Sequence, residues 1–245
     1  MAKALVGTSG WAYASWKPRF YPPEVKAAGF LRHYAGRLRT VEVNYTFNRL
    51  PSAKNIADWS AATPPDFVFA LKASQRITHL DRLRHPADTL PPFWEKVAPL
   101  GERLGPVLFQ TPPWLKRDDD LLASFIAELP SDRRCVLEVR DPSWYVRETY
   151  EILALRNVAL CHADGERAPS PLETLGMTAD LVYLRLRDER GYNEAVLASW
   201  AARCAGLIAS GKDVYAYFRH DDDGSNGLAA ERLVTLLAAL LSSSA

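Results

Sequence analysis

Two glutamates are the first candidates for chemistry. Glu42 and Glu138 each stand near the end of a short apolar run, and each is followed two residues later by another polar side chain, Asn44 and Arg140. Residues two apart in a strand share a face. If both faces point into one cavity, a carboxyl with a raised pKa and one with an ordinary pKa form the acid and base pair that cleaves glycosidic or ester bonds. The alternative is that each carboxylate only pairs with a cation, Lys72 or Arg140.

Lys72 and His79 are further candidates for catalysis. Lys72 ends a predicted strand and could be a Schiff-base nucleophile if desolvation lowers its pKa. The interpretation that we favour is an ion pair with Glu42. His79 follows Thr78 in the next loop, where it can act as general acid or base, donate to a phosphate, or merely order the loop. The predicted catalytic set is Glu42, Glu138, Lys72 and His79.

Other side chains at the predicted strand ends are suited to hold a substrate. Arg140, Arg185 and Arg187 carry forked donors that match carboxylates and phosphates. Trp11 and Trp144 directly follow strands and could stack on a sugar or a base. The predicted substrate-binding residues are Trp11, Asn44, Gln110, Arg140, Trp144, Asp164 and Arg185. The strand ends also carry Arg219, so the mouth that they form is at most mildly cationic, and an anionic ligand fits without being required.

A metal site needs ligands that converge in space, and His162, Asp164, Glu42, Glu138 and His220 could supply oxygen and nitrogen donors. No His-Glu-x-x-His or paired-cysteine signature supports such a site, and cations lie among these candidates. No Gly-x-Gly-x-x-Gly or Walker loop is present either. We therefore expect neither a metal nor another cofactor.

These side chains need a framework that brings strand ends together. Short β-branched or aromatic runs begin near Ala4, Arg39, Phe67, Pro106, Cys135, Val158, Leu181 and Val214. Helical patterns separate most of them, and eight such strand and helix units in a chain of this length predict a single (β/α)8 TIM-like barrel domain over 1–245. A doubly wound open sheet is the alternative. After Asp164, the residues Pro169, Pro171 and Gly176 interrupt the pattern, which predicts a loop with a weak or short sixth helix.

Composition narrows the class of protein. The 245 residues contain 30 Lys plus Arg and 29 Asp plus Glu, a net charge of +1. This balance argues against a nucleic-acid protein that works by bulk basicity, although it allows a local basic patch. The three cysteines lie far apart, and no stretch approaches the ~20 apolar residues of a membrane span. We expect a soluble, cytoplasmic protein whose oligomeric state the sequence does not reveal.

Several motifs in order resemble the YecE-like family, known as domain of unknown function 72. They are Gly7-Thr8-Ser9-Gly10-Trp11 with Trp16 and Phe20-Tyr21-Pro22, Val41-Glu42-Val43-Asn44 with Thr46-Phe47 and Pro51, then Trp59, Lys72-Ala73 with Thr78-His79, Gln110 with Pro112, and Glu138-Val139-Arg140 with Trp144. The resemblance implies a β/α barrel and candidate positions, but no reaction. The chain departs from the family where Arg-Leu-His-Gly is expected, since it has Arg185-Leu186-Arg187-Asp188. It departs again at Phe218-Arg219-His220-Asp221, where the family has an Asn-containing end.

The leading hypothesis is a cofactor-free hydrolase or lyase that acts on a small polar or anionic substrate at the C-terminal mouth of the barrel. The second is a protein that binds a phosphate-rich ligand, such as a nucleic acid, without chemistry. The third is a metal-dependent barrel hydrolase or isomerase. Under the leading hypothesis Glu42 and Glu138 act as acid and base, while Lys72, Arg140 and Arg185 bind charge.

Overall fold

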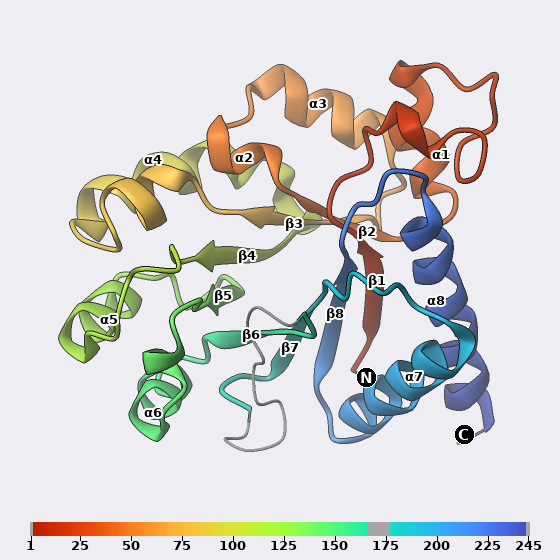
Figure 1. Ribbon diagram of the computed structural model, residues 1–245. Helices are drawn as coiled ribbons and strands as arrows, with labels where there is room; N and C mark the ends of the chain where they lie inside the picture. Colours follow the sequence, from red (N-terminus) through yellow and green to blue (C-terminus); the bar gives the residue numbers. More distant parts are fainter. Residues whose placement is uncertain (1, 166–176, 244–245) are drawn as a thin grey trace.

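The computed structural model describes residues 2–165 and 177–243, and its centre is an eight-stranded parallel sheet (Figure 1). The strands are β1 (Ala4–Thr8), β2 (Thr40–Val43), β3 (Val68–Lys72), β4 (Leu104–Gln110), β5 (Cys135–Glu138), β6 (Ala159–Ala163), β7 (Leu181–Leu186) and β8 (Asp213–Phe218). Each strand from β2 to β7 pairs with the next in the chain, and β8 pairs with β1. This is the (β/α)8 barrel that the strand count predicts.

The seam between β1 and β2 is the narrowest contact in the ring. β1 pairs with β8 from Ala4 to Thr8, whereas β1 meets β2 through one bridge between Ser9 and Glu42. The approach is close, because a Cβ atom on Gly7 would lie 2.1 Å from the carbonyl oxygen of Thr40. Glycine is therefore the residue that lets these two strands meet.

Helices surround the strands (Figure 1). Their bounds are α1 (Phe30–Ala35), α2 (Tyr45–Asn48), α3 (Ala53–Ala62), α4 (Pro86–Val97), α5 (Asp119–Ala127), α6 (Arg147–Ala154), α7 (Glu194–Ala209) and α8 (Ser225–Ser243), with a π-helical turn at Arg76–Leu80. The long helices α7 and α8 lie side by side, and α8 packs on β1 and β8. The predicted short sixth helix, with Pro169, Pro171 and Gly176, falls outside the described residues.

The interior of the barrel has its own apolar core, separate from the layer between strands and helices. Tyr183, Tyr215 and Tyr217 fill it together with small residues such as Ala70 and Cys161. These residues identify the inward face of each strand. Because side chains alternate along a strand, the inward positions two residues further on form the mouth, and most of them are polar, with Ala163 on β6 as an exception.

Candidate functional site

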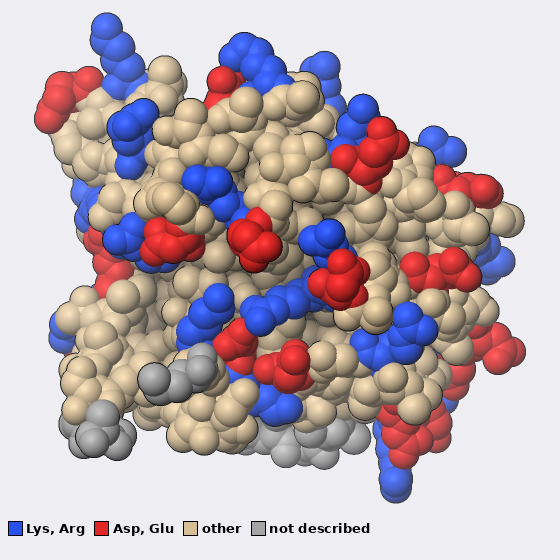
Figure 2. Space-filling view, turned by 180° about the vertical axis from the view of Figure 1, so that it is seen from behind, with Lys and Arg blue, Asp and Glu red and all other residues tan. Residues whose placement is uncertain are grey.

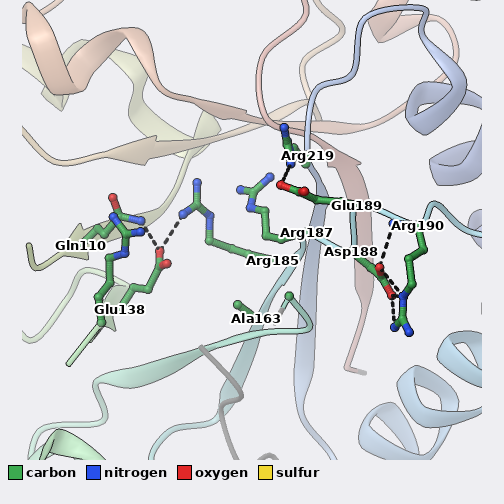
Figure 3. Close-up of a pocket in the computed structure, with 11 residues that line it drawn as sticks. Gln110, Glu138, Ala163, Arg185, Arg187, Asp188, Glu189, Arg190 and Arg219 are labelled. Atoms are coloured by element: carbon green, nitrogen blue, oxygen red, sulfur yellow. Dashed lines mark hydrogen bonds and ion pairs between the residues drawn. The ribbon is translucent and has the colours of Figure 1, made fainter. Parts of the chain in front are cut away.

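A cavity of about 560 Å³ opens at the carboxyl ends of the strands (Figure 3). It is lined by Gln110, Glu138, Arg140, Ala163, Gly165, Arg185, Arg187, Asp188, Glu189, Arg190 and Arg219. These residues end or directly follow β4 to β8, where active sites of β/α barrels lie. A volume of this size matches pockets that hold small molecules.

Glu42 has no exposed surface and contacts two arginines that line this cavity, Arg185 and Arg187. Arg185 binds its carboxylate with two nitrogens, Nε to Oε2 at 3.0 Å and Nη2 to Oε1 at 2.9 Å. The hydroxyls of Ser9 and Tyr183 donate to the same group at 2.6 and 2.9 Å. Nη2 of Arg187 donates to Oε1 at 3.1 Å. Both carboxylate oxygens of Glu42 are therefore occupied by protein donors.

The charge state of Glu42 follows from these contacts. Burial raises the pKa of Glu42, but the positive charges of Arg185 and Arg187 outweigh burial and hold the pKa well below its ordinary value of 4.5. A carboxylate that stays ionised and is closed to solvent cannot exchange protons with a substrate. The acid or base role predicted for Glu42 does not fit this position, and the geometry makes Glu42 the group that holds two arginines in place.

The cation that pairs with Glu42 differs from the predicted one. We expected Lys72, on the neighbouring strand β3, but the ion pairs come from Arg185 and Arg187 on the far side of the ring. Arg185 also reaches the second glutamate, because its Nη1 donates to Oε2 of Glu138 at 2.7 Å (Figure 3). One guanidinium thus joins both carboxylates.

Glu138 is the carboxylate that faces the cavity. Its Oε2 accepts hydrogen bonds from Arg185 and, at 2.9 Å, from Nε2 of Gln110. Its side chain lines the cavity although the residue is only 8% exposed. No hydrogen bond to Oε1 is present among the described residues. Arg140 lines the same cavity, and within 2–165 and 177–243 it has no ion pair, so the predicted pairing of Glu138 with Arg140 is not formed.

Lys72 and His79 both contact Phe47 near the end of β3, and neither is among the residues that line the cavity of about 560 Å³. The amine of Lys72 is 3.9 Å from the ring centroid of Phe47, and the ring of His79 meets Phe47 edge to face at 4.8 Å. Burial, followed by the positive charge of Arg185, lowers the pKa of Lys72 to about 8. Burial and the charges of Lys72 and Arg140 also lower the pKa of His79. Nδ1 of His79 is 2.8 Å from the hydroxyl of Thr78.

The rim of the cavity is a set of ion pairs on the segment after β7. Arg219 donates to Glu189 at 2.7 Å, and Arg190 donates to Asp188 at 2.6 Å (Figure 3). Five arginines and three acidic residues line the cavity, so it carries a positive excess. On the face seen in Figure 2, by contrast, Lys and Arg lie interspersed with Asp and Glu. The positive excess of the cavity is therefore not a feature of that face.

The two departures from the family pattern have identifiable contacts. Arg187 donates to the Ser9 hydroxyl at 2.7 Å as well as to Glu42. It is therefore the second cation, beside Arg185, that pairs with the buried carboxylate of Glu42. His220 stacks on Tyr13 with ring centroids 5.0 Å apart. Asp221 accepts a hydrogen bond from the backbone N–H of Gly224 at 2.7 Å, next to the start of α8.

His162 and Asp164 lie on the other face of β6 from the one we expected, since Cys161 packs in the barrel interior and Ala163 lines the cavity. Burial raises the pKa of Asp164. Its side chain accepts hydrogen bonds from the backbone N–H groups of Arg187 and Asp188, so Asp164 shapes the segment after β7. This position does not suit the binding role predicted for it.

Trp144 also lies away from the cavity. It is fully buried, and its indole N–H donates to the carbonyl of Leu115 at 2.7 Å. Trp11 and Asn44 line a second cavity of about 320 Å³, together with Trp59. In the described part of the chain, Oδ1 of Asn44 is buried without a hydrogen-bond partner.

Sequence reasoning missed three contributors to the site. Ser9 and Tyr183 donate to Glu42, and the segment from Asp188 to Arg190 forms part of the cavity wall. Tyr183 stands two residues before Arg185 and shares its face, which is the signal that could have found it. Within the described ranges, no three His, Cys, Asp or Glu side chains gather as a metal site would require. Every helix in those ranges is too short or too polar to span a bilayer.

Comparison with known proteins assigns the family. The sequence profile described as protein of unknown function DUF72 matches residues 5–244. The chain belongs to this family. A curated relative, UPF0759 protein YunF of Bacillus subtilis (strain 168), is 24% identical over 271 residues, which cover 95% of this chain and 94% of that protein.

Solved structures agree with the barrel. The crystal structure of a DUF72 family protein from Thermotoga maritima MSB8 matches with a TM-score of 0.83 and 27% identity, over 96% of this chain and 99% of the other. SacUVDE matches with a TM-score of 0.53 and 10% identity, over 98% and 99% of the two chains. At that identity the likeness to SacUVDE is one of fold alone.

Proposed function

We propose that this DUF72 protein is an enzyme, a hydrolase or lyase that acts on a small anionic substrate at the mouth of the barrel and uses its own side chains for acid–base catalysis. The observation that carries the proposal is the position of Glu138. One of its oxygens is held by Arg185 and Gln110, and its side chain lines a cavity of about 560 Å³. A carboxyl group fixed in this way is suited to pass a proton to or from a bound molecule.

The arginines supply the second part of the proposal. Arg140 lines the cavity and lacks an ion pair among the described residues, so its forked donors are available to a carboxylate or phosphate. Arg185 and Arg187 are held by Glu42, which fixes their positions before a substrate arrives. Prepositioned charges cost no reorganisation during reaction.

Substitution of Glu138 tests this function. Purified protein is offered p-nitrophenyl acetate, p-nitrophenyl phosphate, p-nitrophenyl glycosides and a set of hydroxy acids, and any turnover is compared between wild type and Glu138→Gln. We expect a loss of about 10²- to 10⁴-fold in kcat, the range for removal of a general acid or base. Glu95→Gln, an exposed position on α4, is the matched control and should leave the rate unchanged. Full activity of the Glu138→Gln protein, with a native circular dichroism spectrum, would refute the assignment.

The cationic lining also favours a second candidate, a protein that grips a phosphate-rich ligand without chemistry. The supporting observation is the excess of five arginines over three acidic residues in the cavity. Binding of an oligonucleotide that weakens steeply with salt and is lost in Arg140→Gln, without turnover of any probe, would favour this candidate over the enzyme.

A further inference from the structure

We propose that Lys72 is an amine nucleophile that forms an imine with a carbonyl group of the substrate. This inference rests on the proposed function of the mouth as an active site, and it names the substrate class as an aldehyde or ketone that carries an anionic group. The arginines of the cavity would bind the anion, and Lys72, whose amine is close enough to Arg185 and Arg140 for their charges to act on it, would react with the carbonyl carbon.

The surroundings of Lys72 leave its amine available for reaction. Lys72 ends β3 two residues after Ala70, which packs inside the barrel, so its side chain starts from the inward face. Its amine forms no hydrogen bond or ion pair within the described ranges and instead lies 3.9 Å from the ring centroid of Phe47. Glu42, the carboxylate that would have engaged it, is already occupied by two arginines.

The charges around Lys72 favour a neutral amine more than ordinary solvent does. Burial makes the largest contribution and lowers the pKa of Lys72. The guanidinium groups of Arg185 and Arg140 lower it further, while the carboxylates of Glu138 and Glu42 raise it. The result is a pKa of about 8 in place of 10.5. At pH 7 about one amine in ten is then neutral, against about one in three thousand for an ordinary lysine.

The chemistry balances without a further reactant. The lone pair of the neutral amine attacks the carbonyl carbon, a C–N bond forms, and the electron pair of the C=O π bond moves to oxygen. The nitrogen loses a proton and the oxygen gains one, which gives a carbinolamine. The nitrogen lone pair then forms the C=N bond as the oxygen, protonated again, leaves as water. Nothing is oxidised or reduced.

His79 is placed to assist these proton transfers. It contacts the same ring as Lys72, that of Phe47, and its Nδ1 lies 2.8 Å from the hydroxyl of Thr78. In the tautomer whose Nδ1–H donates to this hydroxyl, Nε2 is the nitrogen that can accept a proton. Burial and the charge of Lys72 lower the pKa of His79, so the imidazole is neutral at pH 7 and can accept a proton.

Reductive trapping with glyoxylate, a small anionic aldehyde, tests the inference. The intact protein is incubated with glyoxylate and sodium cyanoborohydride at pH 7, and labelling of each lysine is followed by peptide mass spectrometry. We expect Lys72 to be labelled at least about tenfold faster than Lys54, an exposed lysine on α3, because of its larger neutral fraction. Inorganic phosphate should slow labelling of Lys72 and not of Lys54. Labelling of Lys72 no faster than that of Lys54 would overturn the inference.

A pH profile and two variants complete the test. The labelling rate of Lys72 should rise to a plateau with a midpoint near pH 8, whereas a rate that still increases steadily above pH 10 would contradict the proposal. Lys72→Arg should remove this label and leave the others. Fast labelling of Lys72 combined with full turnover by Glu138→Gln would refute the proposed function alone, while an unreactive Lys72 combined with an inactive Glu138→Gln would refute this inference alone.

Discussion

Removal of Arg185 should destabilise the barrel strongly. Arg185→Met deletes two hydrogen bonds to Glu42 and one to Glu138, and it leaves the Glu42 carboxylate buried beside a single guanidinium, that of Arg187. Breaking a buried ion pair by removing one partner costs about 3–5 kcal/mol, because the remaining charge stays desolvated. For a chain of this length, each kcal/mol lowers the Tm by about 2–4 °C. The expected fall in Tm is therefore about 6–20 °C.

The measurement is urea unfolding followed by tryptophan fluorescence and circular dichroism. Arg232→Met provides the control, because Arg232 pairs with Glu194 at 2.5 Å but both side chains are exposed, and an exposed pair contributes about 0–1 kcal/mol. The double variant Glu42→Gln with Arg185→Met should be less destabilised than Arg185→Met alone, since it no longer buries a carboxylate, and Arg187, which loses its partner, keeps 18% of its side chain exposed. A free energy of unfolding for Arg185→Met within about 1 kcal/mol of wild type would refute the reasoning.

Two further predictions concern acid, and a third concerns the seam. Despite burial, Arg185 and Arg187 hold the pKa of Glu42 far below 4.5. The ionised carboxylate therefore stabilises the fold fully above pH 4.5, and this contribution is lost as the pH falls. Urea titrations should show that Glu42→Gln loses less stability than wild type between about pH 5 and 3. Burial lowers the pKa of His162 from 6.5 to about 4. As the pH falls from about 6.5 to 4, the imidazole is protonated in the unfolded chain but stays neutral in the folded protein. The free energy of unfolding of wild type should therefore fall by about 3 kcal/mol over this range, and His162→Gln should abolish this fall. Gly7→Ala would place its Cβ 2.1 Å from the carbonyl oxygen of Thr40 and should abolish soluble expression, while a native-like Tm for this variant would contradict the proposed role of Gly7.

The strands could be predicted because each buried parallel strand is a short apolar run. Every predicted start lies within two residues of the observed one, including Pro106 against Leu104 and Val158 against Ala159. Closure of the ring then brings strand ends together, which is why Glu138, Gln110 and Arg185 meet in one cavity.

The sequence did not predict in the same way which side chains of each strand point into the barrel. Alternation fixes which residues share a face, but β6 is buried on both faces, so nothing in its sequence says whether Cys161 or His162 points inward. The pairing of Glu42 was missed for a different reason. Its partner Arg185 stands on β7, which does not neighbour β2, and a long side chain reaches across the barrel mouth. Sequence order favoured the adjacent cation, Lys72.

The strand pairing of β1 has a consequence for synthesis of the chain. The first of the eight barrel strands to be synthesised forms its ladder with the last of them, from Ala4–Val214 to Thr8–Phe218, and touches β2 through a single bridge. Before synthesis reaches Phe218, β1 has no complete β8 to pair with and can contact β2 only through the single bridge. The part of the mouth that β8 forms is also absent at that stage. Arg185 and Arg187, which bind Glu42, both precede β8, but the ring that encloses them closes only when the eighth strand is complete.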